Sequence, residues 1–302
     1  MTISFEGQVA VVTGAGTGLG RIYATMLAER GASVVINDLG VSVQGEGRSS
    51  VSAEAVAAAI TRAGGKAVAN ADDVADPAGA ARIVEAALGA FGRIDILINN
   101  AGNLRMAPFA DMPQADIDAQ IAVHLHGTLY CTRAALPHMK GQGYGRVIFT
   151  SSPSGLYGLA TQSPYGTAKS GVVGLMNCLV KEHKDDGIAI NTISPSANTR
   201  MSVGLVRPSV ERYLKAEHIA PPVLWMASRD CNVSGVTISA GAGYYTRLEM
   251  YRSDGVQFDP EQDITPEMFA GRYAEIADMS TAQPFRGNMD AIEGKLKAMG
   301  KL

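Results

Sequence analysis

Short apolar runs alternate along this chain with longer stretches in which apolar residues recur at helical spacing. The apolar runs are rich in β-branched residues and do not alternate cleanly with polar ones, which is typical of strands buried on both faces. We predict strands at residues 9–13, 33–38, 66–74, 94–99, 146–151, 188–193 and 236–239. We predict helices at residues 18–30, 53–62, 78–90, 116–139 and 165–184. Pro137 should end or bend the fourth of these helices, because a proline inside a helix removes a backbone hydrogen bond.

This order of elements predicts one α/β domain. Repetition of a strand followed by a helix implies right-handed crossovers and a doubly wound parallel sheet covered by helices on both faces, the Rossmann fold. No linker divides the chain before about residue 245, so we assign residues 1–245 to this domain.

The composition shifts after residue 245, and we assign residues 246–302 to a C-terminal helical extension. Residues 265–267 (Thr-Pro-Glu) have the signature of a helix start, with a capping hydroxyl, a proline in the first position and an acid in the first turn. Phe269, Tyr273 and Ile276 follow at helical spacing and give this helix an apolar face. We expect that face to pack on the core or on a neighbouring subunit.

The composition argues against several classes of protein. The chain has 302 residues, 46% of them hydrophobic and 18% charged, which suits a globular protein with a sizeable core. A net charge of −3 gives no electrostatic reason to expect nucleic acid or a membrane surface as a partner. No apolar run reaches the roughly 18 residues that span a bilayer. With three widely spaced cysteines, five histidines without metal-ligand spacing and no signal peptide, we expect a cytosolic protein with no disulfide framework and no metal site.

A glycine-rich turn, TGAGTGLG at residues 13–20, joins the first predicted strand to the first predicted helix. Such a turn lets the backbone approach a pyrophosphate closely, and the helix N-terminus behind it offers free N–H groups. A glycine pattern alone is weak evidence, but here a strand precedes it, a helix follows it, and Asp38 lies about 20 residues on. The residues of this turn that we expect to contact a cofactor are Gly14, Thr17, Gly18, Leu19 and Gly20.

Asp38 ends the second predicted strand and indicates which dinucleotide binds. A carboxylate at this place accepts hydrogen bonds from both ribose hydroxyls of NAD and repels the 2′-phosphate of NADP. We therefore expect NAD. Arg48, in the glycine-rich stretch that follows, would favour NADP if its loop brought it near.

Two further strand ends carry residues suited to a dinucleotide, because ligands bind at the carboxyl ends of strands in open α/β sheets. Asp73 can accept from the amine of an adenine while Val74 packs on its ring. Asn100, Ala101 and Gly102 follow the fourth strand, where small residues leave room for cofactor and asparagine side chains can tie strand ends together. Asparagine-rich strand ends are also common turn formers.

Tyr165 and Lys169 are four residues apart, so they share one face of a predicted helix, and Ser152 follows the preceding strand. A phenol with its ordinary pKa of about 10 is a poor base near neutrality. We expect the Lys169 ammonium and a cofactor's positive charge to lower the pKa of Tyr165 by about 3 units, for roughly 4 kcal/mol. Ser152 would hydrogen-bond the substrate oxygen. Tyr165 and Lys169 would also contact the cofactor.

These motifs together resemble the short-chain dehydrogenase/reductase family. The glycine turn, Asp38, the NNAG of residues 99–102, Ser152 and the YGTAK of residues 165–169 occur in the order and at the spacing of that family. The resemblance implies an oxidoreductase in which the Ser–Tyr–Lys set transfers the proton between a secondary alcohol and a ketone.

A closer resemblance covers nearly the whole chain, through stretches such as VVINDLG, FGRIDILINNAG and ITPEMFAGRYAEIADM. It is to a subgroup of the family, the (3R)-hydroxyacyl-CoA dehydrogenase domains of type 2 multifunctional enzymes. This resemblance implies NAD as cofactor, an acyl-CoA thioester as substrate and a homodimer, and the pairing of long helices between subunits in this fold also allows a homotetramer.

The chain departs from the family pattern at two places. His124 stands where the family has a catalytic asparagine, which leaves open how a proton relay from Lys169 is completed. Ser194-Pro195-Ser196 replaces the usual Pro-Gly, and Pro195 and Thr199 fall at positions that contact nicotinamide in the family.

The leading substrate hypothesis is a bulky (3R)-hydroxyacyl-CoA, and we expect its pocket around residues 104–109, 156–162 and 196–213. The arginines that could meet the CoA phosphates are Arg105, Arg200 and Arg207. An alternative on the same machinery is a free alcohol or ketone such as a steroid. A non-catalytic NAD-binding protein is the third hypothesis, and the intact Ser–Tyr–Lys set argues against it.

Overall fold

The computed structural model describes residues 2–202, 204, 206–284 and 287–302. The chain divides into two compact units, Met1–Arg247 and Leu248–Leu302. Within the described residues, no helix is long and apolar enough to cross a membrane.

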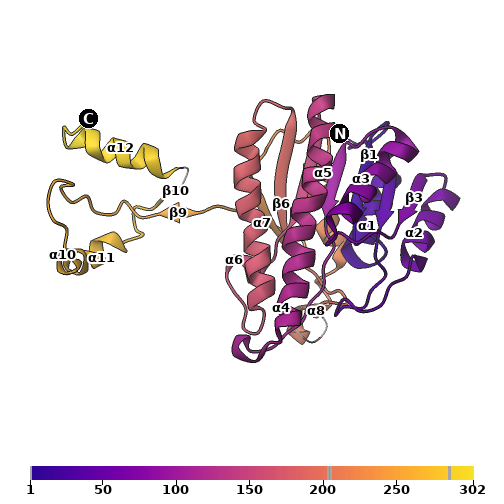
Figure 1. The fold of residues 1–302 in the computed structure, drawn as a ribbon, viewed down its shortest axis with the longest axis horizontal. Helices are drawn as coiled ribbons and strands as arrows, with labels where there is room; N and C mark the ends of the chain where they lie inside the picture. The colour runs from indigo at the N-terminus through magenta and orange to yellow at the C-terminus, as the bar shows by residue number, and fades with distance from the viewer. Residues whose placement is uncertain (1, 203, 205, 285–286) are drawn as a thin grey trace. The chain divides into compact units, whose positions relative to one another are not determined.

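A central sheet organises the first unit (Figure 1). Its strand order is β3-β2-β1-β4-β5-β6-β7-β8, and each neighbouring pair from β3 to β7 is parallel. A tight turn at Ala242 and Gly243, both with positive φ, leads from β7 into β8. The strands are β1 (Val9–Thr13), β2 (Ser33–Asn37), β3 (Lys66–Asn70), β4 (Ile96–Asn99), β5 (Gly145–Thr150), β6 (Ile188–Ser196), β7 (Thr237–Gly241) and β8 (Tyr244–Leu248).

Helices connect successive strands of this sheet. The longer ones are α1 (Gly18–Ala28), α2 (Val51–Arg62), α3 (Pro77–Phe91), α4 (Gln114–Ile121), α5 (Gly127–Gln142), α7 (Ser163–Glu182) and α9 (Ala220–Ala227). The shorter ones are η1 (Phe109–Asp111), α6 (Pro153–Leu156), α8 (Pro208–Glu211) and η3 (Ala216–Ile219), and a π-helical turn, η2 (Ala122–His126), links α4 to α5.

The two faces of the sheet carry separate apolar cores. On β1, Ala10 and Val12 belong to one core together with side chains of α1, α2 and α9. Val9 and Val11 belong to the other core, with side chains of α3, α5 and α7. Because successive strand residues point to opposite faces, β1 is buried on both sides and reads as a continuous apolar run. The predicted doubly wound parallel sheet is therefore confirmed.

Two details of the helices differ from expectation. Helix α5 does not end at Pro137 but continues to Gln142 and is closed by Gly143 in the left-handed conformation, φ 64°. Buried Leu136 and Met139 on either side of the proline keep this last turn against the core, which offsets the lost backbone hydrogen bond. Helix α9 was not predicted, because its eight residues are too few and too uniformly apolar to show a helical period.

The second unit contains three helices and a two-stranded antiparallel sheet among its described residues. Thr265 caps the first helix as predicted, because its hydroxyl accepts a hydrogen bond from the backbone N–H of Met268 at 3.3 Å. The predicted single helix is wrong, since it breaks between Gly271 and Tyr273. The elements are β9 (Tyr251–Arg252), α10 (Pro266–Gly271), α11 (Tyr273–Ile276), β10 (Gln283–Pro284) and α12 (Asn288–Ala298).

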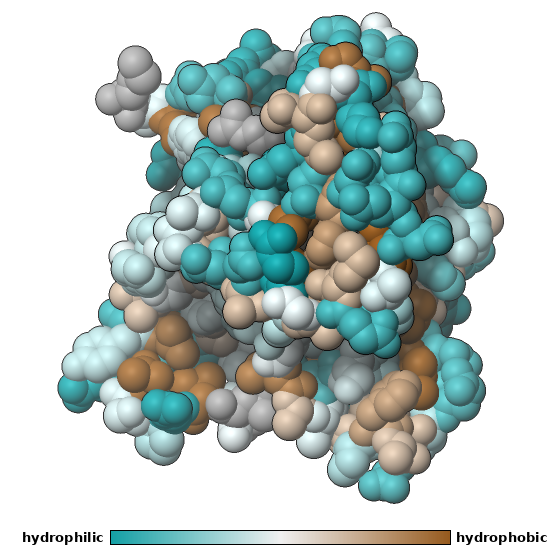
Figure 2. Space-filling view, turned by 90° about the vertical axis from the view of Figure 1, so that its left-hand side faces the viewer, coloured by the Kyte–Doolittle hydropathy of each residue, from teal (hydrophilic) through white to brown (hydrophobic). Residues whose placement is uncertain are grey.

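The apolar side chains of the second unit are largely exposed in the single chain. Phe269 and Tyr273 contact each other, with ring centroids 6.2 Å apart, yet 49% and 59% of their surfaces remain accessible. On the face of the molecule drawn in Figure 2, patches of hydrophobic residues, coloured brown, lie among hydrophilic residues. Packing of this extension on the core or on a second subunit stays a prediction.

Candidate active site

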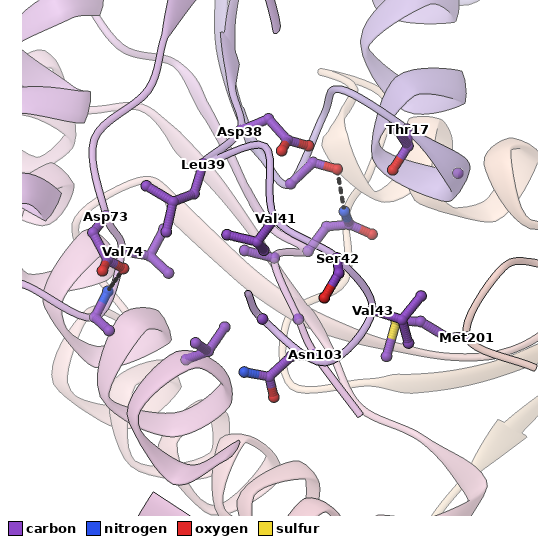
Figure 3. A pocket seen from close by; sticks show the side chains of 18 of the residues that line it. Thr17, Asp38, Leu39, Val41, Ser42, Val43, Asp73, Val74, Asn103 and Met201 are labelled. Atoms are coloured by element: carbon purple, nitrogen blue, oxygen red, sulfur yellow. Dashed lines mark hydrogen bonds between the residues drawn. The ribbon is translucent and has the colours of Figure 1, made fainter. Parts of the chain in front are cut away.

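A cavity of about 350 Å³ lies at the carboxyl ends of β1, β2 and β4, where the strand order reverses (Figure 3). This is the place where open α/β sheets bind their ligands. Among the residues expected to hold a cofactor, those that line it are Gly14, Thr17, Gly18, Leu19, Asp38, Asp73, Val74, Asn100, Ala101, Gly102 and Thr199. Gly20 lies in the first turn of α1, and Pro195 lies near the end of β6. Tyr165 and Lys169 lie on α7. None of these four residues lines the cavity.

The glycine turn is shaped for close approach of backbone to ligand. Gly14 has φ +64°, and a Cβ on Gly20 would lie 2.3 Å from the carbonyl oxygen of Gly14. Glycine at position 20 therefore lets α1 start directly against the turn. Thr17 stands at the N-cap of α1, but its side chain makes no capping hydrogen bond to the helix. The cradle fits the diphosphate of a dinucleotide, because backbone N–H groups at a helix start favour anions.

Asn100 ties the ends of β1 and β4 together, as the sequence predicted. Its amide Nδ2 donates to the carbonyl oxygens of Thr13 at 2.9 Å and Gly14 at 3.2 Å. The hydroxyl of Thr13 in turn accepts from the backbone N–H groups of Asn100 and Ala101, both at 3.0 Å. These four hydrogen bonds fix the end of β1 against the end of β4 at the base of the cavity.

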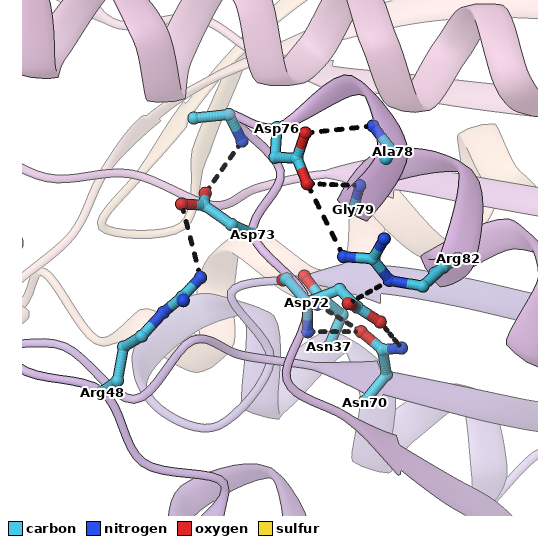
Figure 4. Close-up of polar contacts among 10 residues, drawn as sticks. Asn37, Arg48, Asn70, Asp72, Asp73, Asp76, Ala78, Gly79 and Arg82 are labelled. Atoms are coloured by element: carbon cyan, nitrogen blue, oxygen red, sulfur yellow. Dashed lines mark hydrogen bonds and ion pairs between the residues drawn. The ribbon is translucent and has the colours of Figure 1, made fainter.

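Asp38 projects from the end of β2 at the rim of the cavity. Its carboxylate accepts hydrogen bonds from the backbone N–H of Gly16 at 2.8 Å and that of Gly40 at 2.7 Å. One N–H bond to each oxygen fixes the carboxylate and leaves it further capacity to accept bonds from ribose hydroxyls. Arg48, the residue that could have favoured NADP, forms an ion pair with Asp73 at 3.7 Å (Figure 4).

A polar network beside the cavity, at the ends of β2 and β3, was not anticipated. Asn37 at the end of β2 donates to the side chain of Asn70 and to the backbone oxygen of Asp72, at 2.8 and 2.9 Å. Asp72 also pairs with Arg82 at 2.6 Å (Figure 4). The network aligns the ends of β2 and β3, and Asn37 and Asp72 both line the cavity. The residues of this network come from separate segments of the chain, so no local sequence pattern predicted it.

A second unanticipated feature is the segment of residues 39–49, which we call the strap. Leu39, Val41, Ser42, Val43 and Gly45 of the strap form one wall of the cavity. The sequence indicated only a mobile glycine-rich loop here.

The strap is fastened to the segment after β4. The backbone N–H of Leu104 donates to the carbonyl of Val43 at 3.0 Å, and Nε of Arg105 donates to the carbonyl of Gln44 at 2.7 Å. Arg105 is itself held by Asp116 at 2.6 Å. Arg105 therefore helps to hold the strap in place. Because its charge is already paired with Asp116, the structure argues against its predicted contact with CoA phosphates.

Ser152, Tyr165 and Lys169 come together beside the end of β5. Ser152 is the N-cap of α6, and a hydrogen bond links it to Tyr165. Lys169 lies one helical turn beyond Tyr165, with Nζ 5.7 Å from the centroid of the phenol ring. Its ammonium donates to the carbonyl of Thr150 at 2.6 Å, at the last residue of β5. The expected sharing of one helix face by Tyr165 and Lys169 is thus met in the geometry.

In the chain alone, burial is the main influence on the pKa values of Tyr165 and Lys169. Burial raises the pKa of Tyr165, although the hydrogen bond from Ser152 opposes the rise. Burial also lowers the pKa of Lys169 to about 7. The prediction that Lys169 and a cofactor's positive charge together lower the pKa of Tyr165 concerns the chain with its cofactor bound, and it stays a prediction. Desolvation disfavours both ionised forms, and a lysine that titrates near neutrality is not a full cation there.

His124 lies between the cavity and α7, the helix that carries Tyr165 and Lys169. It is buried in the π-helical turn η2, its Nε2 lies 2.6 Å from the carbonyl oxygen of Asn103, and Asn103 lines the cavity. Its ring meets the ring of Tyr165 edge to face, with centroids 4.9 Å apart. Burial, and then the charge of Lys169, keep the pKa of His124 well below its usual range, so the ring is neutral. A neutral imidazole at this distance donates Nε2–H to the Asn103 carbonyl.

A parallel sheet with a glycine cradle, an aspartate after its second strand and a Ser–Tyr–Lys set at its carboxyl edge defines a nucleotide-dependent oxidoreductase that acts on CH–OH groups. The family model described as "short chain dehydrogenase" matches residues 8–207, and the chain belongs to that family. Members of this family generally bind NAD or NADP.

Relatives and solved structures extend this result over the whole chain. Peroxisomal multifunctional enzyme type 2 of Mus musculus is 42% identical over 99% of this chain and 40% of its own length. Hydroxyacyl-CoA dehydrogenase ChsB1 of Mycobacterium tuberculosis is 33% identical over 91% of this chain and 92% of its own. The structure of full-length peroxisomal multifunctional enzyme type 2 from Drosophila melanogaster matches with a TM-score of 0.81 and 35% identity, over 98% of this chain and 50% of that one.

A more distant solved structure is a 7α-hydroxysteroid dehydrogenase complexed with NADH and 7-oxo glycochenodeoxycholic acid. It matches with a TM-score of 0.72 and 26% identity, over 80% of this chain and 95% of that one. The chain spans half or less of the mouse and fly multifunctional enzymes.

Proposed function

We propose that this chain is an NAD-dependent dehydrogenase that interconverts (3R)-hydroxyacyl-CoA and 3-ketoacyl-CoA, with Tyr165 as the residue that transfers the proton. The observation that carries the proposal is the continuity between cavity and phenol. Asn103 lines the cavity, His124 hydrogen-bonds Asn103, and the His124 ring contacts Tyr165. A substrate held at that phenol would therefore lie beside a dinucleotide in the cavity.

The residues of the chain divide the chemistry among them. A bound oxidised nicotinamide would supply the acceptor for the hydride that leaves the carbinol carbon, and its positive charge would favour the phenolate of Tyr165. Tyr165 takes the hydroxyl proton of the substrate at its phenol oxygen, and returns it in the reverse direction. Ser152 donates a hydrogen bond to the substrate oxygen, and Lys169, beside the phenol ring, helps to hold the cofactor. The substrate loses one hydride and one proton, so the reaction balances.

NAD is the proposed cofactor because of Asp38. A 2′-phosphate would meet a carboxylate that two backbone N–H groups already hold in place. Arg48 is engaged by Asp73, so its charge is partly neutralised. We expect kcat/KM to be higher with NAD than with NADP, and equal values would contradict the assignment of Asp38.

The thioester is supported by the relatives, one of which is named a hydroxyacyl-CoA dehydrogenase. A free steroid is the second candidate, favoured by the structural match to a hydroxysteroid dehydrogenase. Initial rates with a (3R)-hydroxyacyl-CoA, its (3S) isomer, the matching free acid and a hydroxysteroid would separate them. We expect NAD reduction with the (3R) thioester alone; equal rates with the free acid or a higher rate with the steroid would overturn the thioester proposal.

The oligomeric state and the cellular location of the protein are proposals as well. We propose a homodimer or homotetramer that pairs α5 and α7 between subunits, and a monomer by light scattering at micromolar concentration would contradict it. The cytosolic location inferred from the sequence also stays a prediction, and the related multifunctional enzymes of mouse and fly carry peroxisomal names.

A further inference from the structure

Arg200, which the sequence suggested as a contact for CoA phosphates, lines the cavity at the glycine turn. Its guanidinium Nη2 donates to the hydroxyl of Thr17 at 2.8 Å, across 183 residues of sequence. Thr17 is the N-cap of α1, and both residues line the cavity beside Gly14 and Gly18. The contact places a cation at the glycine turn.

The backbone around Arg200 is fixed rather than free. The hydroxyl of Ser202 accepts from the N–H of Thr199 at 2.7 Å and donates to the carbonyl of Ala197 at 2.8 Å. The N–H of Asn198 donates to the carbonyl of Leu214 at 2.7 Å. These bonds close a turn from residue 197 to residue 202, which holds Arg200 at the cavity edge.

The charges of the cavity single out the same residue. Among the described residues that line it, Arg105 and Arg200 are the cations. Arg105 is paired with Asp116, and the lining acids Asp72 and Asp73 are paired with arginines. Arg200 hydrogen-bonds a neutral hydroxyl, so its positive charge is not compensated by a carboxylate in the described part of the chain.

We propose that Arg200 binds the diphosphate of the dinucleotide and is not a CoA-binding residue. The inference rests on the proposed function, because it assigns one contact within the NAD site. A guanidinium has five N–H donors and uses one of them on Thr17, so others remain for phosphate oxygens. Asp38 would then face the ribose and Arg200 the diphosphate, and the two unpaired charges of the cavity match the two polar parts of the ligand.

The test compares a dinucleotide fragment that contains the diphosphate, a fragment that lacks it, and CoA, which carries its own diphosphate and represents the alternative assignment of Arg200. Calorimetry would measure the affinities of ADP-ribose, adenosine and free CoA for the wild type and for Arg200→Gln. We expect Arg200→Gln to weaken ADP-ribose binding about tenfold, since one charge-assisted contact is lost. Adenosine and CoA binding should stay unchanged, and Arg200→Lys should recover part of the ADP-ribose affinity.

Arg21→Gln is the matched control, because Arg21 is exposed on α1 and does not line the cavity. It removes the same charge near the same helix and should leave ADP-ribose affinity unchanged. An equal loss in both variants, an equal loss for adenosine and ADP-ribose, or a loss confined to CoA would each overturn the proposal. If the wild type bound ADP-ribose and Arg200→Gln did so equally well, only this proposal would fail. Absence of any wild-type binding would overturn the proposed function with it.

Discussion

The imidazole of His124 meets the phenol ring of Tyr165 edge to face, with an interplanar angle of 89° and 4.9 Å between centroids. The same imidazole hydrogen-bonds the Asn103 carbonyl on the cavity wall. A π-helical turn between α4 and α5 presents His124 at this point, and such turns are frequent at functional sites. One neutral side chain thus separates the cavity wall from the phenol of Tyr165.

Tyr165→Phe should separate proton transfer from cofactor binding. The variant keeps the ring that His124 contacts and loses only the hydroxyl. We expect kcat to fall by at least about 100-fold, the lower range of what a positioned acid or base contributes. NADH affinity, measured by fluorescence titration, should stay within about twofold of the wild type. Turnover close to the wild-type rate would refute the role given to Tyr165.

His124→Phe should disturb the spacing between Asn103 and Tyr165. The phenylalanine keeps an aromatic ring but leaves the buried Asn103 carbonyl without its shortest hydrogen bond. An orphaned buried acceptor costs about 1–3 kcal/mol, so the free energy of unfolding in urea should fall by that amount. We also expect a lower kcat with little change in the KM for NAD.

The control for this variant is His126→Phe. His126 lies two residues further on in the same turn and is exposed, so it should change neither stability nor kcat. If His124→Phe matched the wild type in both measurements, the spacing role would be wrong.

The fold could be predicted because its signals are local. The run at β1 is apolar from Val9 to Val12 and buried at every position, and the turn that follows it carries the glycines of a phosphate cradle. Tyr165 and Lys169 share a helix face by spacing alone. Each of these features is contained within a few consecutive residues.

The features that escaped prediction depend on contacts between distant residues. The strap wall is fastened by Arg105, 61 residues from its partner Gln44. Arg200 reaches Thr17 across most of the first unit. The lowered pKa of Lys169 follows from its burial, which the sequence alone does not reveal. The sequence therefore predicted which residues carry the chemistry, but it did not predict the burial and the contacts that shift their pKa values.

Burial of Lys169 should make stability depend on pH. Burial lowers the pKa of Lys169 from its ordinary 10.5 to about 7. Between these values the unfolded chain binds a proton that the folded chain has lost, so stability rises with pH across this window. The penalty is fully present below about pH 7 and fades toward pH 10.5.

Lys169→Met removes this titration. Urea unfolding of the wild type at pH 7 and pH 9 should show a gain at the higher pH that exceeds the gain in Lys169→Met by about 2 kcal/mol. Lys181→Met, an exposed position on the same helix, should keep the wild-type difference. Equal pH dependence in the wild type and Lys169→Met would show that the ammonium is not desolvated in the folded chain.

Arg105→Met should loosen the strap without unfolding the domain. The variant loses the exposed hydrogen bond to the Gln44 carbonyl and the half-buried ion pair with Asp116. Such ion pairs contribute little to stability, so the melting temperature should barely change. The strap forms one wall of the cavity, however. Loss of a contact that contributes about 1.4 kcal/mol to holding the strap in place corresponds to a tenfold change in rate. We expect the NADH dissociation rate in stopped flow to rise about tenfold, while Arg133→Met, an exposed arginine on α5, leaves it unchanged. A dissociation rate that is the same in Arg105→Met and the wild type would mean that the strap does not retain the cofactor.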